Sequence, residues 1–299
     1  MKPQNAWAAK GEIVEEWIDI HFFRPLGYLI ARAAGPTRVS PDHLTLVCLI
    51  LGLAAGHLFF YTNPWFNVAG FLLFIVSDIF DSADGQLARM RGTSTRFGRI
   101  LDGVSDNLRF INLYLTVMVR LRMAGWGWTA MGLATLAGAS HSVQSAGVDF
   151  IRQAFLFLGR EGRGELELID DVPAEPQAPW WRRLGVGLYR DYLRNQERLF
   201  PQTFALVRRA REESPGETFQ AAYVEAESGV VRNCAWIGQN IRFVLVAAAC
   251  LAGRPAAFFW ITAVPFTLIL VTLRALQERN AARLAVLLPT EVPEPVHAA

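Results

Sequence analysis

The chain has 299 residues, of which 52% are hydrophobic and 19% are charged, and its formal net charge is +2. Such an apolar composition excludes an ordinary soluble domain and favours an all-α integral membrane protein with several membrane-spanning helices. The small net charge gives no reason to expect nucleic acid as a partner.

The first 35 residues predict an amphipathic segment beside the membrane. Ile13, Trp17, Ile20 and Phe23 recur at helical spacing, and the opposite side carries acidic residues. We expect an interfacial helix lying on the membrane, and a water-exposed helix packed on the rest of the protein is the alternative. The stretch has no apolar run of the kind found in a cleavable leader.

Six apolar segments near membrane-spanning length follow in the sequence. They cover residues 43–62, 66–90, 98–119, 125–150, 235–252 and 255–274. We therefore expect membrane helices one to four within residues 36–158 and helices five and six within residues 233–284.

A polar insertion is expected at residues 159–232, between the fourth and fifth spans. Its sequence opens with a Gly-, Pro- and acid-rich loop and continues into two short amphipathic helices near residues 188–200 and 203–213. We expect it to form a cytosolic cap or an extension of the last helices. The tail at residues 285–299 is expected to be disordered.

Lys and Arg residues predict the orientation of the spans. The loops after the first, third and fifth spans hold only Arg120, Arg122 and Arg254. The other side holds many more, namely Lys2, Lys10, Arg24, Arg32, Arg38, Arg89, Arg91, Arg96, Arg99 and the basic residues of the insertion and tail. Both termini and the turn near residue 93 should therefore face the cytosol. If the protein is bacterial, we expect it in the cytoplasmic membrane.

Four aspartates are arranged to converge at the cytosolic ends of the second and third spans. Asp81 and Asp84 are three residues apart, and Asp102 and Asp106 are four apart, so each pair shares one helix face. A turn of about ten residues makes the two helices antiparallel neighbours. Clustered carboxylates in a membrane protein are costly unless cations bind them. Oxygen ligands of this kind select Mg²⁺ or Mn²⁺, and the spacing suits a site for two ions.

These residues belong to a longer pattern that resembles the signature of the CDP-alcohol phosphotransferase family. The fixed positions of that signature are Asp81, Asp84, Gly85, Ala88, Arg89, Gly98, Asp102 and Asp106. The resemblance implies a homodimeric membrane enzyme with its active site open to the cytosol. Such an enzyme transfers a substituted phosphate from a CDP-linked donor to an alcohol and releases CMP.

The resemblance also implies roles for individual residues. Asp81, Asp84 and Asp102 would be metal ligands, with Asp81 and Asp102 bridging both ions. Asp106 would contact one ion and act as the general base on the acceptor hydroxyl. The residues expected to hold the CDP group are Gly85, Ala88, Arg89, Thr95 and Thr45.

Other polar residues within the predicted spans are expected to line an acceptor pocket or to bond between helices. The candidates for the acceptor pocket are His141, Gln144, Asn240 and Arg242. For Arg109 we expect pairing with an acid on a neighbouring helix, because an unpaired arginine is costly in a membrane. Asp78 is expected to support the site rather than to ligate an ion.

The sequence therefore predicts a metal-dependent phosphatidyltransferase of phospholipid biosynthesis, with CDP-diacylglycerol as the best guess for the donor. One alternative is transfer from a small soluble CDP-alcohol to a lipid or polyol. Another is a catalytically silent scaffold or transporter with the same fold.

Overall fold

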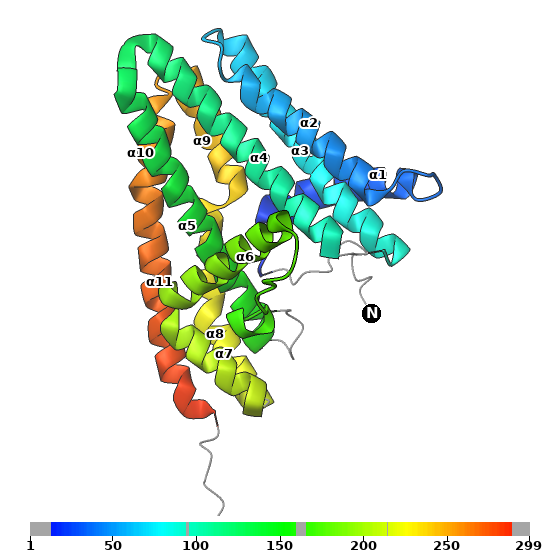
Figure 1. The fold of residues 1–299 in the computed structure, drawn as a ribbon, viewed down its shortest axis with the longest axis vertical. Helices are drawn as coiled ribbons and strands as arrows, with labels where there is room; N and C mark the ends of the chain where they lie inside the picture. Colours follow the sequence, from blue (N-terminus) through cyan, green and yellow to red (C-terminus); the bar gives the residue numbers. More distant parts are fainter. Residues whose placement is uncertain (1–12, 94–95, 160–165, 214, 289–299) are drawn as a thin grey trace, which may run out of the picture. The chain divides into compact units, whose positions relative to one another are not determined.

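The computed structural model describes residues 13–93, 96–159, 166–213 and 215–288. Helices occupy most of these residues and no strand occurs among them, which confirms the all-helical prediction (Figure 1). The chain divides into two compact units, residues 1–143 with 235–268 and residues 144–234 with 269–299.

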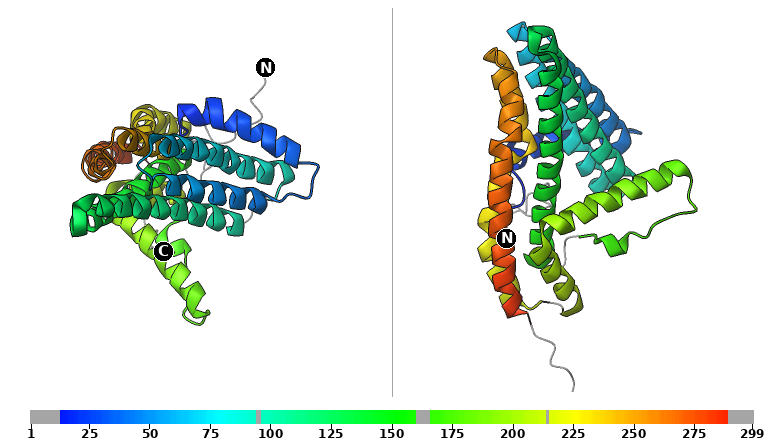
Figure 2. Two further views of the ribbon diagram at one scale, coloured as in Figure 1. Left: turned by 90° about the horizontal axis from the view of Figure 1, so that it is seen from above. Right: turned by 60° about the vertical axis from the view of Figure 1, so that its left-hand side comes forward.

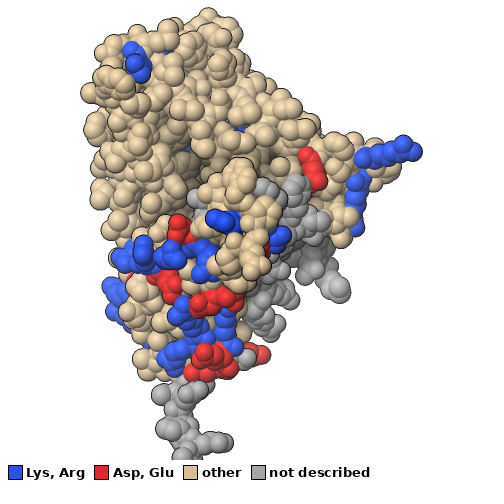
Figure 3. Space-filling view, viewed as in Figure 1, with Lys and Arg blue, Asp and Glu red and all other residues tan. Residues whose placement is uncertain are grey.

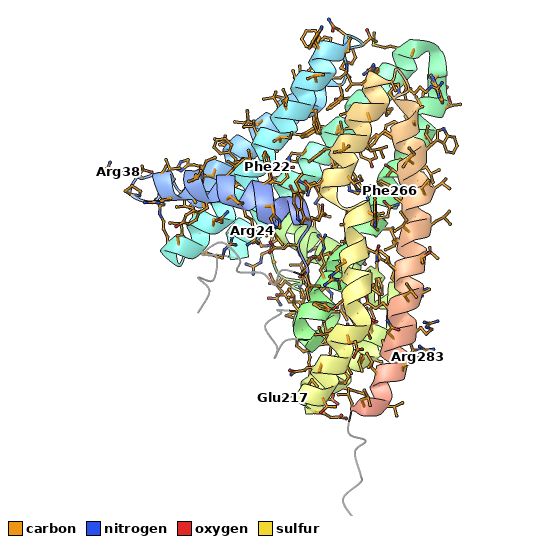
Figure 4. The ribbon with its side chains drawn as sticks, turned by 180° about the vertical axis from the view of Figure 1, so that it is seen from behind. Phe22, Arg24, Arg38, Glu217, Phe266 and Arg283 are labelled. Carbon is orange, nitrogen blue, oxygen red and sulfur yellow. The ribbon has the colours of Figure 1, made fainter. Side chains whose placement is uncertain are left out.

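The first unit contains most of the predicted spans. Its helices are η1 (Asp19–Phe23), α1 (Arg24–Ala34), α2 (Pro41–Leu58), α3 (Pro64–Arg91), α4 (Arg96–Leu121), η2 (Arg122–Trp126), the first part of α5 (Gly127–Gly159), α9 (Gln239–Leu251) and α10 (Ala256–Ala263). Helices α2, α3 and α4 lie side by side, and α1 and α9 pack on α3 (Figure 2). In Figure 4, Arg24 marks the start of α1, and Arg38 lies in the connection that follows this helix.

Local sequence explains where the helices of this unit begin and end. The Ser40 hydroxyl accepts a bond from the backbone N–H of His43, and Pro41 follows at the first helical position of α2. At the start of α3 the Asn63 side chain accepts a bond from the N–H of Trp65. Helix α3 ends at Gly92, whose φ of 63° is in the left-handed region that glycine adopts without strain.

The connection between α3 and α4 is shorter than the sequence predicted. Helix α3 continues to Arg91 and α4 begins at Arg96, so four residues separate them instead of about ten. The charged residues of this stretch continue the helices rather than forming a loop, because arginine is a good helix former. The aspartate-bearing helices are therefore joined by a connection of only four residues.

Arg120 also differs from its predicted place in a loop, because it lies in the last turn of α4. Its side chain is buried, and its Nη1 donates to the Phe59 carbonyl at 3.0 Å and to the Asn67 side chain at 2.8 Å. The guanidinium thus satisfies polar groups at the ends of two neighbouring helices.

The second unit holds the insertion. It contains the rest of α5, η3 (Ile169–Asp171), α6 (Trp180–Leu199), α7 (Pro201–Glu213), α8 (Glu217–Asn233), most of α11 (Pro265–Leu284) and η5 (Ala285–Leu287). Figure 4 marks Glu217 in the first turn of α8 and Arg283 in the last turn of α11. A short segment, η4 (Cys234–Ile237), joins α8 to α9.

Four stretches of the described residues are long and apolar enough to cross a membrane. They are Pro41–Leu58, Pro64–Arg91, Glu217–Leu251 and Ala256–Leu287. The visible surface over the upper parts of α4 and α5 is nearly free of charge, whereas charged side chains gather over α6 and α7 (Figure 3). These features indicate an integral membrane protein. The full set of six spans and the interfacial position of the amino-terminal segment stay predictions.

The predicted sixth span is interrupted in the structure. Helix α10 ends at Ala263 and α11 starts at Pro265. Proline has no backbone N–H to donate and its ring clashes with the preceding turn, so the continuous apolar pattern is divided into two helices.

Candidate active site

Helices α3 and α4 bring three of the four predicted aspartates together. One carboxylate oxygen from each of Asp81, Asp102 and Asp106 lies within 4.8 Å of the other two. All three side chains are half-buried. The spacings of three and four residues place the acids on the facing sides of two adjacent helices.

The fourth aspartate, Asp84, is not part of this group of three and bonds to a neighbouring helix. Its side chain is buried, and its Oδ2 accepts a hydrogen bond from the Thr45 hydroxyl on α2. Thr45 is itself buried and lies 3.3 Å from the Pro41 carbonyl. In this arrangement Asp84 joins α3 to the first turn of α2, and Thr45 is the residue that orients it.

Arg109 on α4 places a positive charge next to two acids of the cluster, Asp81 and Asp106. Its side chain is only 1% exposed. Nη1 lies 3.0 Å from Asp106 Oδ1 and 3.9 Å from Asp81 Oδ1, and Nη2 donates to Asp78 Oδ1. The predicted pairing of Arg109 with an acid on a neighbouring helix is confirmed. The guanidinium links acids of both helices, so it fixes their relative positions.

Asp78 is the buried partner in this network. In addition to the bond from Arg109, its Oδ1 lies 3.1 Å from Gln239 Nε2 on α9. Gly52 on α2 makes room for the arginine, because a Cβ at that position would lie 2.5 Å from Arg109 Nε. The ion pair between α3 and α4 therefore also contacts α2 and α9, so four helices contribute to it.

Three of the predicted CDP-binding residues, Gly85, Ala88 and Arg89, lie on the same part of α3, and Thr45 lies on α2. A Cβ at Gly85 would lie 3.3 Å from Arg89 Nη1, so the glycine keeps the space beside that guanidinium open. Arg89 is exposed and Ala88 is half-buried. Thr95 lies outside the described residues.

The predicted acceptor residues are placed differently from one another. Asn240 donates to Glu16 Oε2 at 2.8 Å and to Asp19 Oδ1 at 2.9 Å, so its amide contacts the amino-terminal segment. Arg242 is buried, donates to the Ile237 carbonyl at 3.0 Å and lies over the Phe266 ring.

His141 packs among aromatic rings, 4.4 Å from the Phe110 centroid and 5.7 Å from that of Tyr114. Gln144 is buried and is the first residue of the second unit. An acceptor role for these four residues stays a prediction.

The residues present fit a hard divalent cation. The cluster of Asp81, Asp102 and Asp106 offers only carboxylate oxygens, the ligands preferred by Mg²⁺ and Mn²⁺. Arg109 balances only part of their negative charge. Three acids within 4.8 Å of one another and half-buried repel unless further positive charge binds there.

Three contributors to the site were not predicted. Gln239, Gly52 and Cys48, whose Sγ lies 3.6 Å from Asp81 Oδ1, come from helices other than those of the aspartates. A polar residue near the start of the predicted fifth span, residues 235–252, was the available signal for Gln239. The sequence carried no signal for Gly52 or Cys48, because small residues are common in any packed membrane helix.

Comparison with known proteins identifies the class of this site. Residues 38–154 match the model of the CDP-alcohol phosphatidyltransferase family. This part of the chain, which contains all four aspartates, is therefore similar to the CDP-alcohol phosphatidyltransferase domain. The resemblance drawn from the sequence is confirmed.

Individual relatives support the same assignment. The chain is 32% identical over 119 residues to a phosphatidylinositol phosphate synthase of Mycobacteroides abscessus. It is 38% identical over 69 residues to a CDP-diacylglycerol–glycerol-3-phosphate 3-phosphatidyltransferase of Rickettsia bellii, and 33% identical over 131 residues to an uncharacterised protein of Aquifex aeolicus.

Each similarity covers only part of this chain and only part of the relative. They cover 38%, 23% and 44% of this chain and 48%, 38% and 62% of the respective relatives. The chain thus spans about half the length of the relatives it matches.

Proposed function

We propose that the protein transfers a substituted phosphate from a CDP-linked donor to an alcohol and releases CMP. The observation that carries the proposal is the convergence of Asp81, Asp102 and Asp106 within the matched domain. CDP-diacylglycerol is the proposed donor, because the two relatives with descriptive names are a phosphatidylinositol phosphate synthase and a phosphatidyltransferase. The acceptor is an alcohol in phospholipid biosynthesis.

The residues of the aspartate cluster have two proposed roles, metal binding and proton transfer. Mg²⁺ or Mn²⁺ held by Asp81, Asp102 and Asp106, with Asp84 nearby, would polarise the donor phosphate and offset the charge of the leaving CMP. Asp106 accepts the proton of the acceptor hydroxyl as that oxygen attacks the β-phosphorus of the donor.

Asp106 is placed suitably for this role. Its side chain is 36% exposed, and Arg109 holds Oδ1 at 3.0 Å. Among the described residues, no donor contacts Asp106 Oδ2, so this oxygen can receive a substrate proton. Arg109 thereby acts as a positioning residue for the base.

The donor would lie along the exposed side of α3. Arg89 offers two N–H groups to a phosphate or a base carbonyl, and Gly85 leaves space for the ligand to approach the helix. Ala88 and Thr95 would complete this surface. Thr45 would contribute through its bond to Asp84.

The membrane arrangement is part of the proposal. We propose six spans, an interfacial amino-terminal segment, a homodimer, and a cytosolic location for the active site and both termini. The burial of Arg120 leaves Arg122 and Arg254 as the exposed cations of the opposite side. Exposed Trp65, Trp126 and Trp128 lie at that end of α3, η2 and α5, as aromatic residues do at membrane interfaces.

The reaction is tested by CMP release from the purified protein. With CDP-diacylglycerol, Mg²⁺ or Mn²⁺ and a panel of alcohols, including glycerol phosphate, inositol phosphate and serine, one acceptor should support CMP release. CDP-linked small alcohols with lipid acceptors form the second panel. Release with only that panel would replace the proposed donor, and no release with either panel would contradict the transferase.

Chelation tests the metal requirement in the same assay. EDTA should abolish CMP release because the proposed ligands are all carboxylates, and added Mg²⁺ or Mn²⁺ should restore it. Full activity after exhaustive chelation would contradict the metal site.

Cysteine labelling tests the orientation. The native cysteines Cys48, Cys234 and Cys250 are buried and should give little background. A cysteine replacing Thr62 should react with an impermeant maleimide in intact cells, whereas one replacing exposed Thr93 should react only after permeabilisation. The reverse pattern would place the aspartate cluster outside the cytosol.

A further inference from the structure

Helix α6 is held by its carboxyl-terminal half. Gln196 Nε2 donates to the Ala146 carbonyl on α5 at 3.0 Å, and the Tyr192 hydroxyl donates to Asp149 Oδ2 at 2.7 Å. Burial, reinforced by the Asp149 charge, raises the pKa of Tyr192, so its hydroxyl stays protonated and can donate. In the other half, a Cβ at Gly185 or Gly187 would meet no atom within 4 Å among the described residues.

The unsupported half of α6 carries an exposed apolar face. Trp180 is 74% exposed and Leu184 is 56% exposed. The two residues are four positions apart, so they lie on one side of the helix. Tryptophan and leucine left in water lose the free energy that burial would provide, and tryptophan prefers the boundary between lipid and water.

A basic edge runs beside this apolar face. Arg183, Arg190 and Arg194 are spaced seven and four residues apart and line a groove of about 340 Å³ beside residues 174–176. Arg190 donates to the Val172 carbonyl, and Arg194 lies 2.5 Å from Asp191. The Arg183 side chain is exposed, and its guanidinium makes no ion pair or hydrogen bond with the described residues. Helix α6 has five arginines against two acids, so its field attracts anions.

The anchor points place α6 at the edge of the membrane. Ala146 and Asp149 lie at the end of the predicted fourth span, residues 125–150. A helix whose carboxyl-terminal half is fixed there lies where lipid headgroups meet water, and its pattern is that of helices that lie in this interface. A soluble partner protein would have to reach the same face through the headgroup layer.

We propose that the amino-terminal half of α6 docks on anionic phospholipid. Trp180 and Leu184 enter the interface, and Arg183 and Arg194 contact headgroup phosphates. This lipid contact is separate from the aspartate cluster and does not depend on the proposed transferase activity.

The full-length protein in lipid nanodiscs tests the contact. A spin label on Leu184→Cys should be accessible to oxygen and protected from a water-soluble nickel complex when the disc contains phosphatidylglycerol. The matched label on Glu212→Cys, an exposed position on α7, should remain accessible to nickel. Nickel accessibility at residue 184 equal to that at residue 212 would overturn the proposal.

Charge variants test the basic edge. Each basic residue near an anionic surface shifts the docking equilibrium about fivefold. Replacing both arginines (Arg183→Gln and Arg194→Gln) should therefore reduce the docking equilibrium constant about thirtyfold. Discs of phosphatidylcholine alone should give a similar loss. The label at residue 184 is compared in the wild-type background and the double arginine variant, each in discs with and without phosphatidylglycerol. Equal protection of the label from nickel in all four samples would contradict headgroup binding.

Free phosphate separates a lipid site from a general anion site. In discs containing phosphatidylglycerol, inorganic phosphate or glycerol phosphate at matched ionic strength should leave the label protected, because neither provides an interface for Trp180. Release of the label by either anion would show that the groove binds soluble phosphates and would overturn the lipid assignment.

Discussion

Turnover by the Asp106→Asn variant should fall by about 10²–10⁴-fold, the usual contribution of a general base. The amide keeps the size of the side chain and one coordinating oxygen but cannot accept the proton of the acceptor hydroxyl. Donor binding in the presence of metal should stay near normal. Raising the pH should partly restore turnover, because hydroxide can replace the missing base. CMP release across pH, with donor binding followed by calorimetry, provides the measurement.

Asp81→Asn is the informative comparison for this variant. It removes a carboxylate from the proposed metal site, so metal binding and donor binding should both be lost, and high pH should not restore activity. Glu212→Gln, the same chemical change at an exposed position on α7, is the matched control. If Asp106→Asn and Asp81→Asn lose donor binding equally, Asp106 is mainly a ligand and the base assignment is wrong.

Arg109→Gln should lower the free energy of unfolding by about 3–5 kcal/mol, because it leaves a buried carboxylate without its partner. Asp78 determines this loss, since its side chain is 8% exposed whereas that of Asp106 is 36% exposed and remains hydrated. Gly52→Ala should act in the same direction by displacing the guanidinium. Unfolding in detergent micelles provides the measurement.

A double substitution tests whether the pair itself is responsible. Combining Asp78→Asn with Arg109→Gln removes both charges, so it should cost clearly less than the sum of the single substitutions. Arg32→Gln on the exposed side of α1 is the control and should change stability by less than about 0.5 kcal/mol. Wild-type stability of the Arg109 variant would contradict the structural role of the ion pair.

The sequence was sufficient to predict helices for all six apolar segments and the meeting of Asp81 with Asp102 and Asp106. These features follow from helical periodicity, which depends on neighbouring residues alone. The rotation of Asp84 towards Thr45 was not predictable in this way, because the two residues are 39 positions apart on different helices. Periodicity states which residues share a face but not which neighbouring helix that face meets.

Arg109 and Arg120 illustrate the same limit. The cost of an unpaired arginine in a membrane predicted a partner for Arg109, and the structure adds that one guanidinium contacts Asp78, Asp81 and Asp106. Arg120 was assigned to a loop because charge usually marks the end of a span. Its acceptors, the Phe59 carbonyl and the Asn67 side chain, lie 61 and 53 residues earlier in the sequence.

The ion pair between Asp78 and Arg109 also bears on how the protein is made. Helix α3 leaves the ribosome before α4, so Asp78 would enter the bilayer alone if the helices inserted one at a time. Each such charge costs about 2.5–3.5 kcal/mol at the centre of a membrane. Insertion of α3 and α4 as one hairpin brings the two charges together and avoids both costs. The connection of four residues between the helices suits that route. If the helices insert as a hairpin, nascent chains carrying Arg109→Gln should show delayed protection of α3 from protease.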